Sequence, residues 1–404
     1  MINDMKLMMR RILYTFPEFV HKILTKHYIN NAIGFIMTDE DRNACLSDEK
    51  IKSEVLAKYK KKYPQQVKRM NFYIRKLLKS KSKLSQMSDT EQEKILKDME
   101  FCWFAYGFQI DEYIFLDLNG VNKTHQARGM LVSDAERIAF RFSANDLTYT
   151  ALSDKSTAYE ILKKFYKRDV VIINSKKDFR SFSAFVSKHP LFVQKAVRSS
   201  RGESVILVDI KDFAYEGGNV YFNSLIDQGK FILEEVIVQT DDMKQYNQDS
   251  VNTVRVSTFM TKNGVEPAFG FLRTGRAGSF IDNCATGGVF ATVDCKKGIV
   301  ISDACDELGN RYVLHPDSEI MFKGFKLPDW EEAISIVKEA AMMAPNTKYL
   351  SWDLAHSIKY GWVIVEVNTS GQFMWQAGTL KGTRKELEKL VDNMDLIVSC
   401  KIKA

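Results

Sequence analysis

The chain has 404 residues, of which 45% are apolar and 27% charged, and its formal net charge is +7. This is ordinary globular composition, with enough length for two or three domains. No stretch approaches the roughly 20 uninterrupted apolar residues that a membrane-spanning helix needs, and the N-terminus lacks the apolar core and small-residue cleavage site of a secretory signal. We therefore expect a cytoplasmic protein.

The six cysteines are scattered along the chain, with no C-x-x-C pair and no histidine at zinc-finger spacing. This pattern argues for reduced thiols and excludes a disulfide framework or a structural zinc site.

The positive charge is concentrated near the N-terminus, where the first 100 residues carry 21 Lys and Arg against 13 Asp and Glu. A basic segment can attract nucleic acid or an anionic membrane surface. Amphipathic helices with a solvated Lys-rich face show the same composition without binding a polyanion. We favour the solvated face and expect no nucleic-acid partner.

Residues 1–110 read as a helical, basic region. Helix-forming residues dominate, and Ser88 with Glu91 has the spacing of a capping box. Beyond this region, residues 111–118 predict a strand, and residues 153–175 predict a loop, a helix and a strand in turn.

From residue 188 onward, strands predominate. Their apolar and β-branched runs predict strands over 191–197, 203–210, 219–226, 230–239, 253–261, 267–275, 288–294, 348–355 and 361–368. Helices are predicted over 330–344 and 383–400. Together these elements predict an α+β or mixed α/β fold with mostly antiparallel strands. We divide the chain into a helical region over 1–110, an α/β region over 111–187 and a core over 188–404.

Two of the late strands carry a group of oxygen-bearing side chains. The strands at 348–355 and 361–368 are close enough to pair as a hairpin, which would bring Asp353 near Glu366 and Asn368 on one face. Two carboxylates and an amide oxygen suit Mg²⁺, which keeps some waters and is completed by nucleotide phosphates. Ordinary strand amphipathicity produces the same pattern and remains an alternative.

A phosphate-binding arrangement is suggested by Lys195 on the strand 191–197, followed by a loop with Ser199, Ser200 and Gly202. Backbone N–H groups of such a loop beside a lysine form a workable phosphate cradle. The P-loop pattern and the G-x-G-x-x-G pattern are both missing, and a plain hairpin turn is the alternative.

Glu234 and Glu235 lie where an apolar strand ends, before a polar connection. A hinge of this kind can present backbone groups to adenine while a carboxylate accepts from a ribose hydroxyl or the adenine amine. Paired glutamates at a strand end are also common without a ligand.

Three further polar residues, Asn252, Arg255 and Arg273, fall on or beside two successive strands. Arg255 has apolar neighbours on both sides, so its guanidinium would be costly to bury without an anion. Arginine forks bind phosphate or carboxylate in a bidentate way.

Taken in order, these features resemble the ATP-grasp superfamily, and more narrowly its sugar-transfer-associated or teichuronopeptide-type branch. The segments that carry the resemblance are "LFVQKAV", "SSRGES", "ILEEVIVQ", "VNTVRV", "RTGRAGSFIDNCATGG", "HPDS", "LPDW", "LSWDLA" and "VIVEVN". The resemblance implies two α+β lobes that clamp ATP between their sheets, preceded by the helical N-terminal region. One departure is the single glycine of "SSRGES", where the superfamily usually has several.

The resemblance also implies roles for individual residues. It implies ATP and two Mg²⁺ ions as cofactors. It implies phosphate or nucleotide contacts for Lys155, Lys195, Ser199, Ser200, Gly202 and Asn252, and adenine or ribose contacts for Glu234, Glu235 and Gln239. It implies metal ligation by Asp353, Glu366 and Asn368. Arg255 and Arg273 would bind the γ-phosphate or the acceptor carboxylate.

The activity implied by the resemblance is an ATP-dependent carboxylate-amine ligase that works through an acyl phosphate. The branch's link to surface polysaccharide suggests a uronic-acid sugar or another carboxylate, joined to an amino acid or amine. One alternative keeps the nucleotide site but phosphorylates a sugar or small molecule. Another is a non-catalytic scaffold whose basic N-terminal helices dock to the inner face of a membrane or to a partner in glycan assembly.

Overall fold

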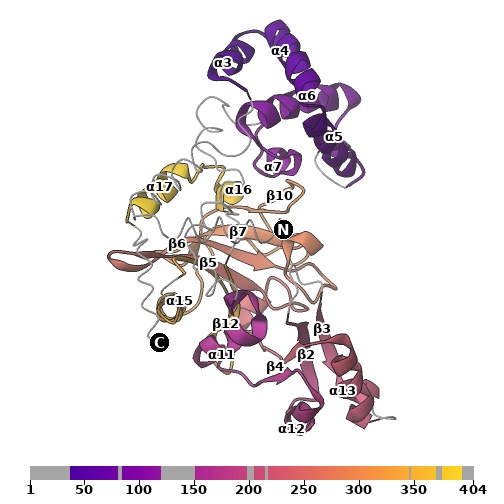
Figure 1. Ribbon diagram of the computed structural model, residues 1–404. Coiled ribbons are helices and arrows are strands. Elements are labelled where there is room, and N and C mark those ends of the chain that lie inside the picture. The colour runs from indigo at the N-terminus through magenta and orange to yellow at the C-terminus, as the bar shows by residue number, and fades with distance from the viewer. Residues whose placement is uncertain are drawn as a thin grey trace, which may run out of the picture. The chain divides into compact units, whose positions relative to one another are not determined.

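The structure is a computed structural model that describes residues 37–80, 84–119, 151–197, 204–213, 217–344, 347–369 and 375–393 (Figure 1). The chain forms two compact units. Unit 1 comprises Met1–Ser143, Ser302–Tyr312 and Gln372–Ala404, and unit 2 comprises Ala144–Ile301 and Val313–Gly371. The division into three consecutive segments that we drew from the sequence stays a prediction.

Unit 1 is mainly helical in its described part. Its helices are α3 (Asp39–Ser47), α4 (Glu49–Lys62), α5 (Pro64–Leu78), α6 (Asp89–Tyr106), α7 (Ile110–Phe115), α16 (Trp375–Thr379) and α17 (Arg384–Asn393). A short antiparallel pair, β9 (Ala304–Cys305) with β10 (Arg311–Tyr312), completes it. The predicted capping box of Ser88 and Glu91 is present at the start of α6. Among the described residues, no helix combines the length and apolar character that crossing a bilayer requires.

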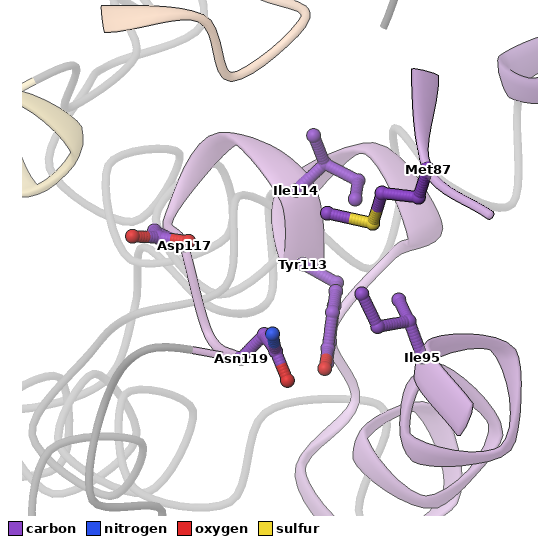
Figure 2. Close-up of a pocket in the computed structure, with 6 residues that line it drawn as sticks. All are labelled: Met87, Ile95, Tyr113, Ile114, Asp117 and Asn119. Carbon is purple, nitrogen blue, oxygen red and sulfur yellow. The ribbon is translucent and has the colours of Figure 1, made fainter. Parts of the chain in front are cut away.

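The strand predicted over 111–118 is wrong, because this segment is the helix α7. A capping box between Gln109 and Glu112 begins the helix. Ile110, Tyr113 and Ile114 are buried, a spacing that matches one helical face rather than strand alternation. Figure 2 shows the small pocket beside this face, which is lined by Met87, Ile95, Tyr113, Ile114, Asp117 and Asn119.

Unit 2 contains a four-stranded sheet in the order β1-β4-β2-β3, in which every neighbouring pair is antiparallel. We call it the small sheet. Its strands are β1 (Val170–Ile173), β2 (Leu191–Ala196), β3 (Val205–Asp209) and β4 (Phe231–Glu235), and the helices α12 (Phe179–Lys188) and α13 (Gly217–Gln228) accompany it. Aromatic and aliphatic side chains from the sheet and both helices form one buried cluster. Burial of this apolar surface is the main force that holds the helices on the sheet.

The helix α13 replaces the strand that we predicted over 219–226. Tyr221, Phe222 and Leu225 are its buried apolar residues, and Leu225 is four residues from Tyr221 and three from Phe222, the spacings that share one side of a helix. A strand would have buried every second residue instead. The helix α12, which we did not predict, buries Phe182 and Phe185 in the same cluster.

The second sheet of unit 2, the large sheet, has the strand order β7-β6-β5-β11-β12, with β8 paired to β7. Its strands are β5 (Thr253–Thr261), β6 (Gly264–Thr274), β7 (Val289–Asp294), β8 (Ile299–Val300), β11 (Tyr349–Ser357) and β12 (Gly361–Asn368). All these pairs are antiparallel, so the predicted mixed α/β fold with mostly antiparallel strands is confirmed.

Three helices complete unit 2: α11 (Lys155–Tyr166), α14 (Asp241–Lys244) and α15 (Trp330–Met342). Trp330 at the start of α15 packs edge-to-face on Trp362 of β12, with ring centroids 6.1 Å apart. Helix α11 packs on β12 as well, and Figure 1 shows the two side by side.

A β-bulge in β12 decides which side chains share a face. Asp353 pairs with Glu366, whereas its neighbour Leu354 pairs with Ile364, so Val365 is an extra residue in β12. Partners in register point to the same face of a sheet. Ile364 therefore shares a face with Leu354, and Glu366 shares the opposite face with Asp353. Since Trp362 lies two residues before Ile364 in the regular part of the strand, the face of Ile364 is the one that meets α15.

Candidate active site

The face of the large sheet opposite α15 carries a row of charged side chains, which we call the polar face. Arg255 of β5 pairs with Asp353 of β11, which in turn pairs with Glu366 of β12. Arg273 of β6 pairs with Thr253, two residues before Arg255. Four successive strands thus contribute to one row, and the hairpin that we predicted from the sequence forms.

Asp353 lies at the centre of this row and is 2% exposed. Its carboxylate accepts from Arg255 Nε at 2.6 Å and Nη2 at 2.7 Å. Arg273 Nη2 lies 3.0 Å away, and Asn368 Nδ2 donates at 3.3 Å. Burial alone would raise the pKa of Asp353, but the charges of Arg255 and Arg273 outweigh it and hold the pKa at about 2. Asp353 is therefore an anion at neutral pH.

Glu366 is more accessible, with a side chain that is 36% exposed, and it forms an ion pair with Lys155 Nζ at 3.2 Å. Lys155 is the first residue of α11, which Asp154 caps through a side-chain hydrogen bond. The Lys155 backbone N–H donates to the carbonyl of Val197, just past β2, at 3.3 Å. Lys155 thus lies between Glu366 and the end of the strand that leads to the predicted phosphate loop. Ser199, Ser200 and Gly202 of that loop lie outside the described residues.

Arg273 is held by a second carboxylate that sequence reasoning did not connect with it. Its Nε and Nη2 donate to Thr253 Oγ1 at 3.0 and 2.7 Å, and Nε lies 3.6 Å from Asp282. Asp282 accepts from the backbone N–H of Thr253 at 3.1 Å and also from its hydroxyl. Burial raises the pKa of Asp282, while Asp282 and Asp353 together outweigh burial and raise the pKa of Arg273.

The donor set of the polar face fits a hard divalent cation. Two carboxylates, from Asp353 and Glu366, and the amide oxygen of Asn368 are the ligand types that Mg²⁺ takes together with waters and phosphate. Asn368 uses its amide nitrogen toward Asp353, so its oxygen is directed elsewhere. The structure brings these three predicted residues together on adjacent strands.

Glu234 and Lys195, both predicted nucleotide contacts, bind each other. Glu234 Oε1 lies 2.9 Å from Lys195 Nζ, and Glu234 Oε2 accepts from Arg168 Nε at 3.0 Å and Nη2 at 2.5 Å. Burial would raise the pKa of Glu234, but the two cations lower it. Glu234 is 3% exposed, so its carboxylate is engaged with protein cations, one of which the sequence did not point to.

The other predicted adenine and ribose residues lie at the connection between the two sheets. Glu235 accepts from the backbone N–H of Asp169 at 3.0 Å and from the Tyr360 hydroxyl at 2.9 Å. Gln239 donates to the Ser250 carbonyl at 2.6 Å and accepts from the Asn252 N–H at 3.0 Å. Both Gln239 and Asn252 are buried. Their side chains fix the path of the chain from 239 to 252.

Comparison with known proteins gives one family match. The family model described as sugar-transfer associated ATP-grasp matches residues 140–391, more than half of the chain. No curated protein matches the chain.

Several solved structures are similar to the chain. One is a D-alanine-D-alanine ligase from Coxiella burnetii, at 10% identity and a TM-score of 0.39, with 62% of this chain and 59% of that chain covered. Another is the ATP-grasp ligase PsnB complexed with minimal precursor, at 11% identity and a TM-score of 0.39, with 62% and 63% covered. A third is a D-alanine–D-alanine ligase from Bacillus anthracis complexed with ATP, at 15% identity and a TM-score of 0.38, with 62% and 67% covered. The chain thus spans less than two thirds of the first two.

Proposed function

Because this chain belongs to the sugar-transfer associated ATP-grasp family, we propose that it is an ATP-dependent carboxylate-amine ligase. The family resemblance and the ATP-grasp fold expected from the sequence are confirmed by this match. The activity, its substrates and its cofactors are the proposal.

The observation that carries the proposal is the convergence of oxygen donors and cations on the polar face. Asp353, Glu366 and Asn368 lie on the paired strands β11 and β12. Arg255 and Arg273 lie beside them, each within 3.0 Å of Asp353. This combination suits a nucleoside triphosphate with its metal ion, because the cations bind phosphate oxygens while the oxygen donors bind the metal.

Asp353, Glu366 and Asn368 would hold Mg²⁺, which supplies charge neutralisation and orientation of the triphosphate when it is bound. Lys155 and Lys195 would contact phosphate oxygens, together with backbone groups around Ser199, Ser200 and Gly202. Glu235 and the chain that Gln239 and Asn252 fix would lie near the adenine and ribose. We propose two metal ions, as the family resemblance implies.

Arg255 and Arg273 serve the chemical step in this proposal. The acceptor carboxylate attacks the γ-phosphorus of ATP, the bond from that phosphorus to the bridging oxygen breaks, and ADP leaves. The two guanidinium groups stabilise the charge on the transferring phosphoryl oxygens. An amine then attacks the carbonyl carbon of the acyl phosphate, loses a proton and displaces inorganic phosphate, which leaves an amide.

For the substrates we propose a uronic-acid sugar or another carboxylate and an amino acid, in the synthesis of surface polysaccharide or glycopeptide. The description of the family as sugar-transfer associated supports this choice. The alternative to a solvated face is a contact of the Lys-rich end of α4, where Lys61 and Lys62 are exposed, with an anionic membrane surface. Sedimentation with anionic liposomes at low and high salt would test this contact, which must weaken as salt rises.

The test of the ligase is product analysis with Mg-ATP and a panel of uronic-acid sugars and amino acids. Phosphorus NMR should show free phosphate, and mass spectrometry should show an amide. Phosphate left on an acceptor hydroxyl would instead identify a kinase. If Mg-ATP does not raise the melting temperature of the protein and no product forms, the result would fit the scaffold alternative.

Two glutamate variants make the test specific for the site. Glu366→Gln should lower Mg-dependent ADP release by roughly a hundredfold, because a metal ligand is lost. Glu339→Gln is the matched control, since Glu339 on α15 is exposed and binds Lys164 at 2.9 Å and the Ser335 hydroxyl at 3.4 Å, away from the polar face. Equal ADP release by the wild type and Glu366→Gln would refute the proposed metal site.

A further inference from the structure

Arg168 is a buried cation outside the predicted site. It follows α11, just before β1, and its side chain is 1% exposed. Two of its nitrogens donate to Glu234, at 3.0 and 2.5 Å. The third, Nη1, donates to the backbone carbonyls of Tyr166 at 3.2 Å and Ile364 at 2.7 Å. Arg168 therefore joins β4 of the small sheet to β12 of the large sheet.

Among the described residues, the two cations that bind Glu234 carry more charge than its single carboxylate. Arg168 and Lys195 each carry +1, Glu234 carries −1, and all three are less than 9% exposed. A buried cluster with a net positive charge favours the binding of an anion, because charges are poorly screened there. If Arg168 were absent, Glu234 and Lys195 would form a neutral pair. The charge of Lys195 would then be compensated by Glu234 and would attract a phosphate less strongly.

The contact with Ile364 places Arg168 at the β-bulge. Ile364 is the last residue before the extra residue Val365, and Glu366 follows on the polar face. Lys195 and Glu366 belong to different sheets. Through Glu234 on one side and the Ile364 carbonyl on the other, one guanidinium fixes the strands that carry both residues.

We propose that Arg168 is a positioning residue for ATP. It compensates the charge of Glu234 so that Lys195 is available to a phosphate. This inference rests on the proposed function, since it presumes that the polar face binds Mg-ATP. Its test therefore uses the binding of Mg-ATP, measured by calorimetry, rather than turnover.

Arg168→Met should weaken Mg-ATP binding about tenfold, the loss expected when one charge-assisted phosphate contact is impaired. The double variant Arg168→Met with Glu234→Gln should recover binding to within about threefold of the wild type, because Lys195 is no longer held by a carboxylate. Arg168→Lys keeps the charge and should also stay within about threefold. Lys164→Met is the matched control and should bind as the wild type does, because its side chain is 75% exposed.

Recovery in the double variant separates this role from packing. A merely structural arginine would leave the double variant as weak as Arg168→Met or weaker, and that result would overturn the inference. Wild-type affinity in folded Arg168→Met would also overturn it. If Arg168→Met does not fold, the test uses Arg168→Lys and the double variant, whose Mg-ATP affinities should both stay within about threefold of the wild type. Mg-ATP affinity more than about tenfold weaker in both variants counts against the inference. A wild-type protein that binds no Mg-ATP refutes the proposed function itself.

Discussion

Asp353→Asn is the substitution whose effect can be worked out most fully from the structure. Asparagine keeps the shape of the side chain but removes its charge. Arg255 and Arg273, which now lie 2.6 to 3.0 Å from the carboxylate, would lose their shared counter-ion in a buried site. Breaking a buried ion pair from one side is strongly destabilising, because the remaining charge is left uncompensated.

The magnitude follows from the pKa of Asp353, which is about 2 against an ordinary value of 3.8. A lowering by roughly two pKa units, at about 1.36 kcal/mol each, corresponds to about 2 to 3 kcal/mol of stability. Because the pKa is lowered in the folded state, this stability is present above about pH 4 and is lost as the pH falls toward 2. Asp353→Asn should therefore be less stable than the wild type by about 2 to 3 kcal/mol at pH 7, with a smaller difference near pH 3.

The assay is urea unfolding of the wild type and Asp353→Asn at pH 7, 4 and 3, followed by tryptophan fluorescence. Trp352 and Trp362, which are fully buried in the large sheet, report on the unit that contains the substitution. Asp227→Asn, at an exposed position in α13, is the control and should change stability by less than about 0.5 kcal/mol. A stability difference that is absent at pH 7, or equally large at pH 7 and pH 3, would refute the reasoning.

Three further outcomes are expected. Asn368→Ala should raise the Mg²⁺ concentration for half-maximal ADP release about tenfold, and an unchanged Mg²⁺ titration would remove Asn368 from the metal site. Gln239→Ala should lower the unfolding free energy by about 1 to 3 kcal/mol, because buried backbone groups lose their partners. It should also weaken ATP binding, because the chain that Gln239 fixes is proposed to lie near the adenine and ribose, and unchanged ATP binding with lowered stability would argue against that placement. Gly298→Ala should cost about 2 kcal/mol or more in urea unfolding, because a Cβ at its φ of +65° would lie 2.3 Å from Trp330, whereas Gly324, at a φ of +93° with open space around it, should tolerate alanine better.

Most strands of unit 2 could be predicted from the sequence, because runs such as 253–261 and 361–368 combine β-branched residues with clear turn signals. The segments 111–118 and 219–226 were predicted wrongly because the same kind of local pattern, a short apolar run, was read as a strand. Each segment is about two helical turns long and rich in apolar residues. Over so short a length, the strand pattern and the helix pattern cannot be distinguished from the local sequence. The neighbours that bury Tyr113 or Phe222 decide the outcome, and they are distant in sequence.

The site was predictable to the extent that it depends on local pairing. The short connection between the two late strands was sufficient to bring Asp353 beside Glu366. The anion that compensates Arg255 is Asp353, 98 residues away, which the local pattern could not identify. Arg168 gave no signal, because its partners Glu234 and Ile364 lie 66 and 196 residues further along the chain.

The extra residue at position 365 also makes the hairpin respond unequally to changes in length. Deleting Val365 would restore a regular two-residue alternation, with Ile364 and Glu366 still on opposite sides and Asp353 still opposite Glu366. Inserting a residue after Val365 would require a second irregularity in β12. Without it, the Glu366 side chain would turn to the other face of the sheet, where Trp362 packs on Trp330. Shortening by one residue should thus be tolerated far better than lengthening by one.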